Sequence, residues 1–248
     1  MDWMRRLLRR LWERIARRGG EDGGRSPRTD SRVDGVRAML VKMTVEEFSD
    51  ALAAGTPTPG GGSAAALSGT LAASLALMVC DLTLGRERYA AHEEAVRSIR
   101  ERAGALRRDL LALVDRDAEA YGEVMRALRM PKESEAQKRD RATALAHANL
   151  FATETPIATA EACAALMGLV IELARKGNVN AVSDVGSAAL LAYAGLRAAV
   201  MNVRVNLKGI KDQEKAAKAR ERVRRLEIDA ERLREEALAA AFARMNSL

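Results

Sequence analysis

The sequence predicts an all-α protein, built as an up-and-down bundle of long helices. Hydrophobic residues make up 48% of the chain but aromatic residues only 3%, so the core must consist mainly of Ala, Leu, Val and Met. Alanine at this density favours helix over strand. Apolar residues recur every three or four positions over long stretches, and no useful stretch alternates with the period of two that is typical of a strand.

The beginning of the chain differs from the rest, so we expect a terminal segment over residues 1–38 and a helical domain over residues 39–248. Residues 1–38 hold 11 of the 41 basic residues and 6 of the 34 acidic ones. Residues 3–18, WMRRLLRRLWERIARR, place an apolar stripe opposite arginines, and a flexible linker rich in Gly and Ser follows. Such a helix could bind a membrane surface or a partner through residues 1–18, and a disordered extension is the alternative.

The helical domain should begin with a short helix followed by a long one. A capping box of Thr44 and Glu47 predicts a helix over residues 44–54, which ends at the Gly- and Pro-rich segment 55–63. The next helix, over residues 63–84, begins with eighteen uncharged residues, of which eleven are Ala, Ser, Gly or Thr. This composition is too weakly apolar for a membrane span and fits a buried central helix.

Two long amphipathic helices come next. The first is expected over residues 87–128 and ends before Pro131. The second is expected over residues 133–175 and stops at Gly177, with Pro156 expected to kink or divide it.

Two more helices complete the domain, over residues 184–207 and 211–245, and Asp184 can cap the first of them. Short connections between long helices imply the up-and-down arrangement. The apolar stripes exceed what one small bundle needs, so we expect a homodimer that forms through helix faces.

The composition also excludes several classes of protein. Cys80 and Cys163 lie in apolar stretches, which indicates buried free thiols in a reducing compartment such as the cytoplasm. Two histidines provide no metal site, and without a P-loop or a dinucleotide fingerprint we expect no tightly bound cofactor. The net charge of +7 falls largely on residues 1–38, and few aromatic residues are present to stack on bases, so we expect no nucleic-acid binding.

Two segments could carry chemistry in the first half of the domain. In TPTPGGGSAAA (56–66), three glycines allow a close approach, and the free N–H groups of the following helix would face an anion. In LVDRDAEAY (113–121), Asp115 and Glu119 share one helix face, while Asp117 lies on nearly the opposite one. A carboxylate there could act as a general base or stabilise a cation. A tight turn and a solvated helix face are the structural alternatives.

Two further segments place polar residues at the ends of apolar helices. Asn178 and Asp184 lie at the start of the helix over residues 184–207, and Asn202 and Asn206 lie one turn apart near its end. Amides in an apolar helix need hydrogen-bond partners, so they indicate either a buried polar network or a ligand. In MVCDLTLGRERY (78–89), polar residues likewise end an apolar helix.

Taken together, these segments resemble the cyclodeaminase/cyclohydrolase family. The matching residues are PGGGSAAA (59–66), MV..LT.GR..Y (78–89), LVD.DA.AY (113–121), MPK (130–132) and GN....SD...AA....G...A..NV..NLK (177–208). Their order and spacing fit over about residues 41–210, and residues 1–38 lie outside the resemblance.

The resemblance implies an all-helical, dimeric enzyme of folate one-carbon metabolism whose substrate is a tetrahydrofolate derivative. Members act on the carbon between N5 and N10. Cyclohydrolases interconvert the methenyl and 10-formyl forms with water, whereas cyclodeaminases form the methenyl bridge from a formimino group and release ammonia. A standalone chain favours methenyltetrahydrofolate cyclohydrolase. Formiminotetrahydrofolate cyclodeaminase is the alternative, and a non-catalytic helical interaction protein is the third hypothesis.

Around this chemistry, candidate roles can be assigned to residues. Either Asp115 or Asp184 would be the catalytic carboxylate, with Asp117 a weaker candidate. Asn202 and Asn206 would orient the pterin or water. The remaining candidates would hold the carboxylates of the glutamate tail, and they are Gly60, Gly61, Gly62, Ser63, Arg86 and Lys208.

Overall fold

The computed structural model describes residues 39–246, so the basic helix and linker predicted over residues 1–38 lie outside the described residues. Within residues 39–246 every regular element is a helix, which confirms the all-α fold class. The elements are, in order, η1 (Leu40–Lys42), α2 (Val45–Ala53), α3 (Gly61–Thr83), η2 (Glu87–His92), α4 (Glu93–Leu128), α5 (Glu135–Lys176), η3 (Val179–Ala181), α6 (Val182–Asn206), η4 (Leu207–Gly209) and α7 (Gln213–Met245).

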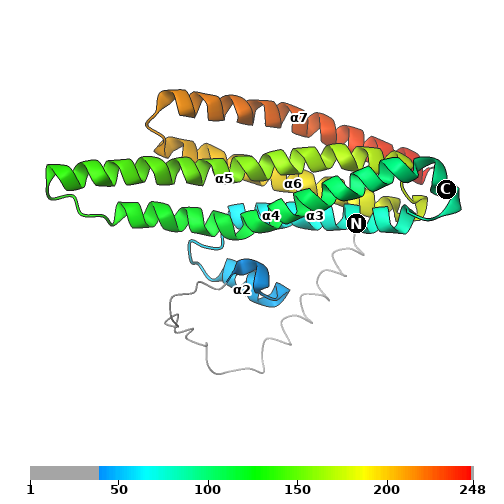
Figure 1. Ribbon diagram of the computed structural model, residues 1–248, viewed down its shortest axis with the longest axis horizontal. Helices are drawn as coiled ribbons and strands as arrows, with labels where there is room; N and C mark the ends of the chain where they lie inside the picture. Colours follow the sequence, from blue (N-terminus) through cyan, green and yellow to red (C-terminus); the bar gives the residue numbers. More distant parts are fainter. Residues whose placement is uncertain (1–38, 247–248) are drawn as a thin grey trace, which may run out of the picture. The chain divides into compact units, whose positions relative to one another are not determined.

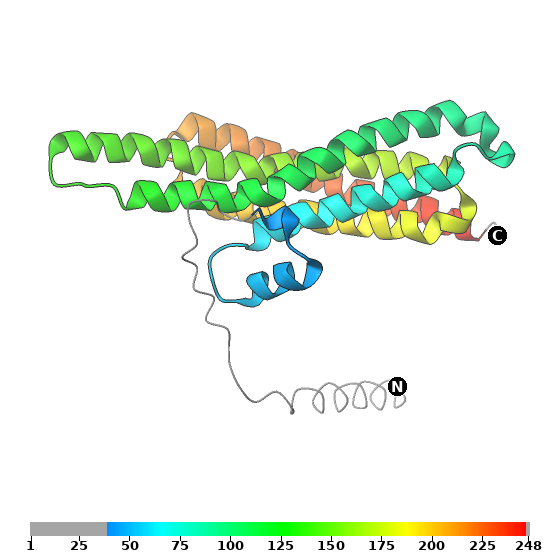
Figure 2. The ribbon, with the colours of Figure 1, turned by 60° about the horizontal axis from the view of Figure 1, so that its bottom comes forward.

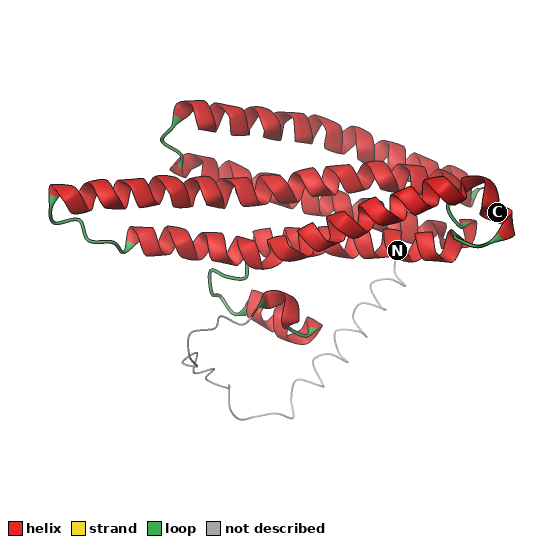
Figure 3. Cartoon of the chain, viewed as in Figure 1, coloured by secondary structure: helices red, strands yellow, loops and turns green. Residues whose placement is uncertain are grey.

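Helices α3 to α6 form an antiparallel up-and-down bundle, as predicted (Figure 1, Figure 3). Helix α3 packs against α4 and α6, and α5 closes the bundle by packing against the same two helices. Helix α7 covers α5 and α6. Helices α4 and α5 are longer than α3 and α6, and the hairpin that joins them runs on past the start of α3 (Figure 1).

The predicted helix ends lie within two residues of the observed ones, except for the start expected at residue 87, but at two other starts the small shift changes the position of a polar residue in its helix. Helix α3 begins at Gly61, after Gly60 as a cap without a side chain, so Ser63 lies inside the first turn instead of preceding the helix. Helix α6 begins at Val182 after Ala181, so Asp184 lies in its first turn and is not its cap. The helix expected from residue 87 starts as the separate 3₁₀ turn η2.

Pro156 lies inside α5 and is buried, yet it does not divide the helix, which is continuous over 42 residues. Proline has no N–H group, so it leaves the carbonyl oxygen four residues earlier without its usual helical partner. That oxygen belongs to Ala152, and an amide of α6 takes the place of the missing donor.

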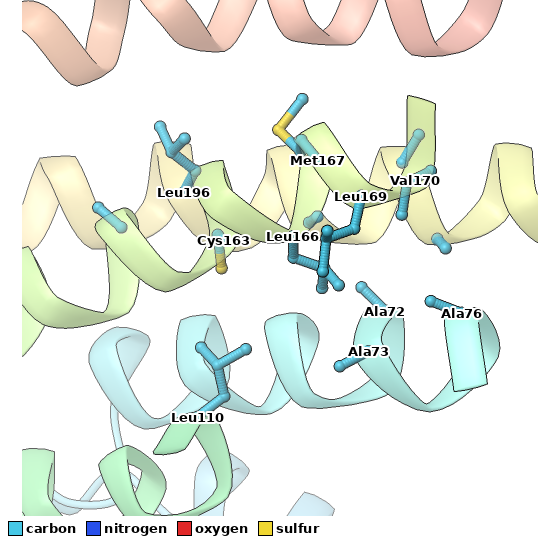
Figure 4. Close-up of a cluster of buried hydrophobic side chains, with 14 of the residues drawn as sticks. Ala72, Ala73, Ala76, Leu110, Cys163, Leu166, Met167, Leu169, Val170 and Leu196 are labelled. Carbon is cyan, nitrogen blue, oxygen red and sulfur yellow. The ribbon is translucent and has the colours of Figure 1, made fainter. Parts of the chain in front are cut away.

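The core is built from small and branched side chains, with the sulfur of Cys163 near its centre (Figure 4). Both predicted thiols are free and buried, and burial raises their pKa to about 12. Helices α3 and α6 approach closely at Gly195, where a Cβ atom would lie 2.8 Å from the carbonyl oxygen of Ala65 and 3.2 Å from the backbone nitrogen of Gly69. Helices α3 and α5 approach closely at Gly69, where a Cβ atom would lie 2.7 Å from the sulfur of Cys163.

Within residues 39–246, three helical segments are by length and composition apolar enough to cross a membrane: Gly61–Thr83, Glu135–Lys176 and Val179–Gly209. The prediction that the composition of residues 63–84 is too weakly apolar for a span is therefore wrong. In the structure the three segments pack against one another and supply most of the core of the bundle.

We predict that Gly195→Ala lowers the free energy of unfolding by about 1–3 kcal/mol, because the added methyl group meets backbone at the α3–α6 contact. Gly168→Ala, on α5, is the matched control: no atom lies within 4 Å of its Cβ position, so the substitution should stabilise the helix by about 0.5–1 kcal/mol. Urea unfolding at fixed protein concentration measures both, and equal midpoints for the two variants would contradict the packing described.

Candidate active site

A pocket of about 270 Å³ lies where α3 begins and α6 ends, against the last third of α4 and the first half of α5. Figure 2 shows these four helices side by side at the start of α3. The pocket brings together four segments that lie far apart in the sequence. Its walls consist of Pro57, Thr58, Gly60, Gly61, Gly62, Asp117, Ala120, Tyr121, Val124, Asn149, Ala152, Asn202 and Asn206.

The carboxylate of Asp117, on α4, binds the first turn of α3. The backbone N–H of Ser63 donates to Asp117 Oδ2 over 2.9 Å, and the Ser63 hydroxyl oxygen lies 3.0 Å from the same atom. The hydroxyl also lies 3.0 Å from the carbonyl oxygen of Val114. The first N–H groups of a helix have no partner inside it, so a carboxylate from another helix takes over the capping role that Gly60 cannot fill.

Gly62 makes this approach possible. A Cβ atom at that position would lie 2.0 Å from Asp117 Oδ1 and 2.4 Å from Cγ, so no larger residue fits while the carboxylate stays in place. At Gly61 the nearest atom to a Cβ would be Nδ2 of Asn202 at 3.5 Å, which is an ordinary contact. The anion predicted to face the glycine turn is therefore supplied by the chain itself.

Among the described residues that line the pocket, Asp117 is the only charged one. Burial raises the pKa of its carboxyl group above the ordinary value, and the two hydrogen bonds from Ser63 partly oppose this effect. The part of the pocket wall that the structure describes therefore has one acidic group and no basic group, an arrangement that favours a cationic or donor-rich ligand over an anion.

Three amide side chains surround this carboxylate, and each donates its Nδ2 group to a backbone carbonyl. Asn206 donates to Ala152 over 2.6 Å. Asn202 donates to Ala198 over 2.9 Å, and Asn149 donates to Gly209 over 2.9 Å. Asn149 lies on α5 and was not among the predicted site residues.

Of the predicted site residues, the structure brings Gly60, Gly61, Gly62, Asn202 and Asn206 to this pocket, with Ser63 directly behind it. Lys208 is exposed on η4 and is not part of the wall.

The two carboxylates predicted to be catalytic lie elsewhere in this chain. Asp115 accepts a hydrogen bond from the backbone N–H of Leu40 and so holds η1 against α4. Asp184 lies 22 residues before Asn206 on the same helix, about 33 Å away at 1.5 Å per residue. Arg86 is exposed beside η2, beyond the far end of α3. Their catalytic and binding roles therefore stay predictions.

Three other polar residues of the sequence motifs, Thr83, Tyr89 and Asn178, meet at that far end as a buried network. The N–H of Asn178 donates to the Thr83 hydroxyl over 2.8 Å, and its Nδ2 donates to Leu82 over 2.9 Å. The Tyr89 hydroxyl binds Asn178 Oδ1 and accepts from the N–H of Val179. This network joins α3, η2 and the α5–α6 connection, so Asn178 has a structural role.

Within residues 39–246 no group of three or more His, Cys, Asp or Glu side chains is placed to hold a metal ion. Three other grooves on the described part of the bundle are larger and more open. One, of about 830 Å³, lies between α3 and α4 and is lined by four arginines. The second, of about 480 Å³, lies between α4 and α5 beside His147, and the third, of about 440 Å³, lies between α5 and α7. None of the three contains the residues that the motifs bring together at the pocket.

Comparison with known proteins agrees with this arrangement. The sequence pattern of the formiminotransferase-cyclodeaminase family matches residues 44–225. The chain belongs to this family. It is 43% identical over 189 residues to a methenyltetrahydrofolate cyclohydrolase of Methylorubrum extorquens, which covers 76% of this chain and 89% of that protein. This confirms the resemblance inferred from the motifs.

More distant relatives share the same domain. A formimidoyltransferase-cyclodeaminase of Sus scrofa is 32% identical over 189 residues, but the match spans only 35% of that longer protein. The crystal structure of a formiminotetrahydrofolate cyclodeaminase from Thermotoga maritima superposes with a TM-score of 0.72 at 29% identity, covering 82% of this chain and 97% of that one. The family domain therefore includes both the pocket and the far-end network.

We predict that Gly62→Ala displaces the Asp117 carboxylate from the start of α3 and lowers the thermal midpoint, since a buried carboxylate and the Ser63 N–H would both lose their partner. The expected loss is about 1–3 kcal/mol. Gly61→Ala is the matched control, one residue earlier, and should leave the midpoint nearly unchanged. Calorimetry at neutral pH distinguishes them, and a Gly62→Ala protein as stable as Gly61→Ala would show that the two groups are not in contact.

Proposed function

We propose that this chain is a methenyltetrahydrofolate cyclohydrolase, which adds water to the carbon bridge between N5 and N10. The observation that carries the proposal is the half-buried carboxylate of Asp117, the one charged group among the described residues that line the pocket, whose other polar side chains are amides and hydroxyls. The 43% identity to a methenyltetrahydrofolate cyclohydrolase over most of both chains supports it. Folate one-carbon chemistry is also what the names of the other relatives describe.

The charge of the substrate fits this pocket. The methenyl bridge is an amidinium-like cation, and a carboxylate in a partly desolvated wall stabilises such a cation more strongly than it would in water. The amide oxygens of the wall suit the N–H groups of the pterin. The carboxylates of the glutamate tail would be repelled by Asp117, so they would leave the pocket toward solvent, where the exposed Lys208 is a candidate partner.

In the proposed reaction Asp117 is the only side chain that accepts and returns a proton. Water attacks the bridge carbon, and Asp117 takes one of its protons as the C–O bond forms. As the bond between carbon and N5 breaks, the protonated Asp117 returns a proton to N5, and the remaining hydroxyl proton passes to solvent as the formyl C=O forms. The sum is methenyl cation plus water giving the 10-formyl compound and one proton.

The raised pKa of Asp117 suits this cycle, because a carboxylate of higher pKa is a better base. Cyclodeaminase activity would use the same carbon and the same carboxylate, with ammonia in place of water as the group exchanged. Assays with both substrates decide between the two reactions, and a chain inactive with both would be an interaction protein.

Replacing the three candidate carboxylates one at a time tests the proposal. Following the loss of methenyltetrahydrofolate absorbance, we expect Asp117→Asn to lower kcat by a factor on the order of 10² to 10⁴, the usual contribution of a general base. Asp184→Asn and Asp115→Asn should keep most of the turnover, since neither residue lines the pocket. Circular dichroism confirms that each variant is folded.

The pH dependence gives a second readout. Because the carboxylate must be ionised to accept a proton, kcat/KM should fall as the pH drops through a pKa above the ordinary 3.8 of Asp.

Wild-type turnover in Asp117→Asn, or loss of turnover in Asp184→Asn, would show that Asp117 is not the catalytic carboxylate.

We also propose that the protein is a homodimer that forms through the outer faces of α3 and α6, which pack side by side. No charged residue occurs on α3 between Ser63 and Cys80. The exposed apolar residues of this surface, the α3–α6 apolar face, are Leu71, Met78, Leu82, Leu190, Met201 and Val205. Several large apolar side chains exposed on neighbouring helices favour association with a second copy. Met201 and Val205 each precede a pocket amide, so the partner would border the pocket.

A charge placed on this face tests the dimer. Met201→Asp should convert a particle of two chains into one of 26.9 kDa, measured by light scattering after gel filtration. Ile228→Asp is the matched control, because Ile228 on α7 is 60% exposed against 62% for Met201 but lies outside the face. A wild-type protein that runs as a single chain, or a Met201→Asp protein that still runs as two, would contradict the proposal.

A further inference from the structure

Asn206 donates a hydrogen bond to the carbonyl oxygen of Ala152, which has no helical donor because residue 156 is a proline. In an uninterrupted helix the N–H of residue 156 would donate to the carbonyl of residue 152. Proline removes that donor, and its ring pushes against the same carbonyl. The Ala152 oxygen instead accepts from Nδ2 of Asn206 over 2.6 Å, across the α5–α6 contact. Ala152 and Asn206 both line the pocket, whereas Pro156 is buried one turn behind it.

This bond determines which end of the amide faces the ligand. A backbone carbonyl can only accept a hydrogen bond, so the NH₂ group of Asn206 must point to it and the Oδ1 atom must point elsewhere. Asn202 and Asn149 are held in the same way by the carbonyls of Ala198 and Gly209. Within the described residues no N–H or O–H group donates to any of the three Oδ1 atoms, so each is available as an acceptor.

We propose that Pro156 is a positioning residue: it frees the Ala152 carbonyl so that Asn206 presents an oxygen, and not an NH₂ group, to the pocket. With Asp117 and the other two amides, this makes a wall of acceptors that binds a cationic, N–H-bearing heterocycle and disfavours an anionic or acceptor-rich one. The inference deepens the proposed function and rests on it for the identity of the ligand. The orientation of the amide is a property of the chain alone.

Pro156→Ala is the direct test, because it restores the helical donor without touching the pocket lining. We expect kcat/KM for methenyltetrahydrofolate to fall about tenfold, the value of one well-placed hydrogen bond, while the thermal midpoint stays equal or rises since a proline has left the helix interior. Gly168→Ala on the same helix is the control: it should also stabilise α5, but with wild-type kinetics. If Pro156 had only a structural role, Pro156→Ala would not lower activity while leaving the protein equally or more stable.

A double-mutant cycle makes the coupling specific. Asn206→Ala should also lower kcat/KM in the wild-type background, and it should cost little more in the Pro156→Ala background, because the amide has already lost its anchor. Additive losses, or Pro156→Ala with unchanged kcat/KM, would overturn the inference.

A measurement without substrate separates this inference from the proposed function. In protein labelled with ¹⁵N-asparagine, the side-chain NH₂ signals of Asn206, assigned by their loss in Asn206→Ala, should be protected from hydrogen exchange and should lose that protection in Pro156→Ala. Unprotected signals in the wild-type protein would overturn the inference. If the signals behave as expected but no folate is turned over, the positioning role stands and the proposed reaction falls.

Discussion

The contact between the Asp117 carboxylate and the first turn of α3 is the interaction on which the rest of the site depends. A helix begins with N–H groups that lack partners and with a partial positive charge, so it attracts an anion. Here the anion comes from α4, and it can approach because Gly62 has no side chain. One contact thus joins two helices of the bundle and holds a partly buried carboxylate in the wall of the pocket.

The polar groups around this carboxylate are oriented before any ligand binds. Each of the three pocket amides donates to a backbone carbonyl, so its dipole is held by the fold and not by the substrate. Groups that are already oriented need no reorganisation as charge changes at the reacting carbon, which is the main source of electrostatic catalysis. At the other end of α3 and α6, the hydrogen bonds of Asn178 to Thr83 and Leu82 hold the end of α3 to the segment that precedes α6.

The fold could be predicted from the sequence because its signals are local. Helical periodicity, the capping box at Thr44 and the glycine at residue 177 lie within a few residues of the helix ends that they determine. The choice of carboxylate could not be predicted in this way, since Asp115 and Asp117 differ only in the helix face they occupy, and the packing of α3 on α4 decides which face meets the pocket. Asn149 was missed because its partner, Gly209, lies sixty residues away. The separation of Asp184 from Asn206 was predictable, however, because the length of α6 alone places them at opposite ends of that helix.

A structure with bound methenyltetrahydrofolate, or a stable analogue of it, tests the central claim most directly. We predict that the carbon between N5 and N10 lies about 3–4 Å from a carboxylate oxygen of Asp117 or from a water bound to it, and that pterin N–H groups donate to the amide oxygens of the pocket. A ligand bound in the arginine-lined groove between α3 and α4, or beside Asp184 at the far end of the bundle, would contradict it.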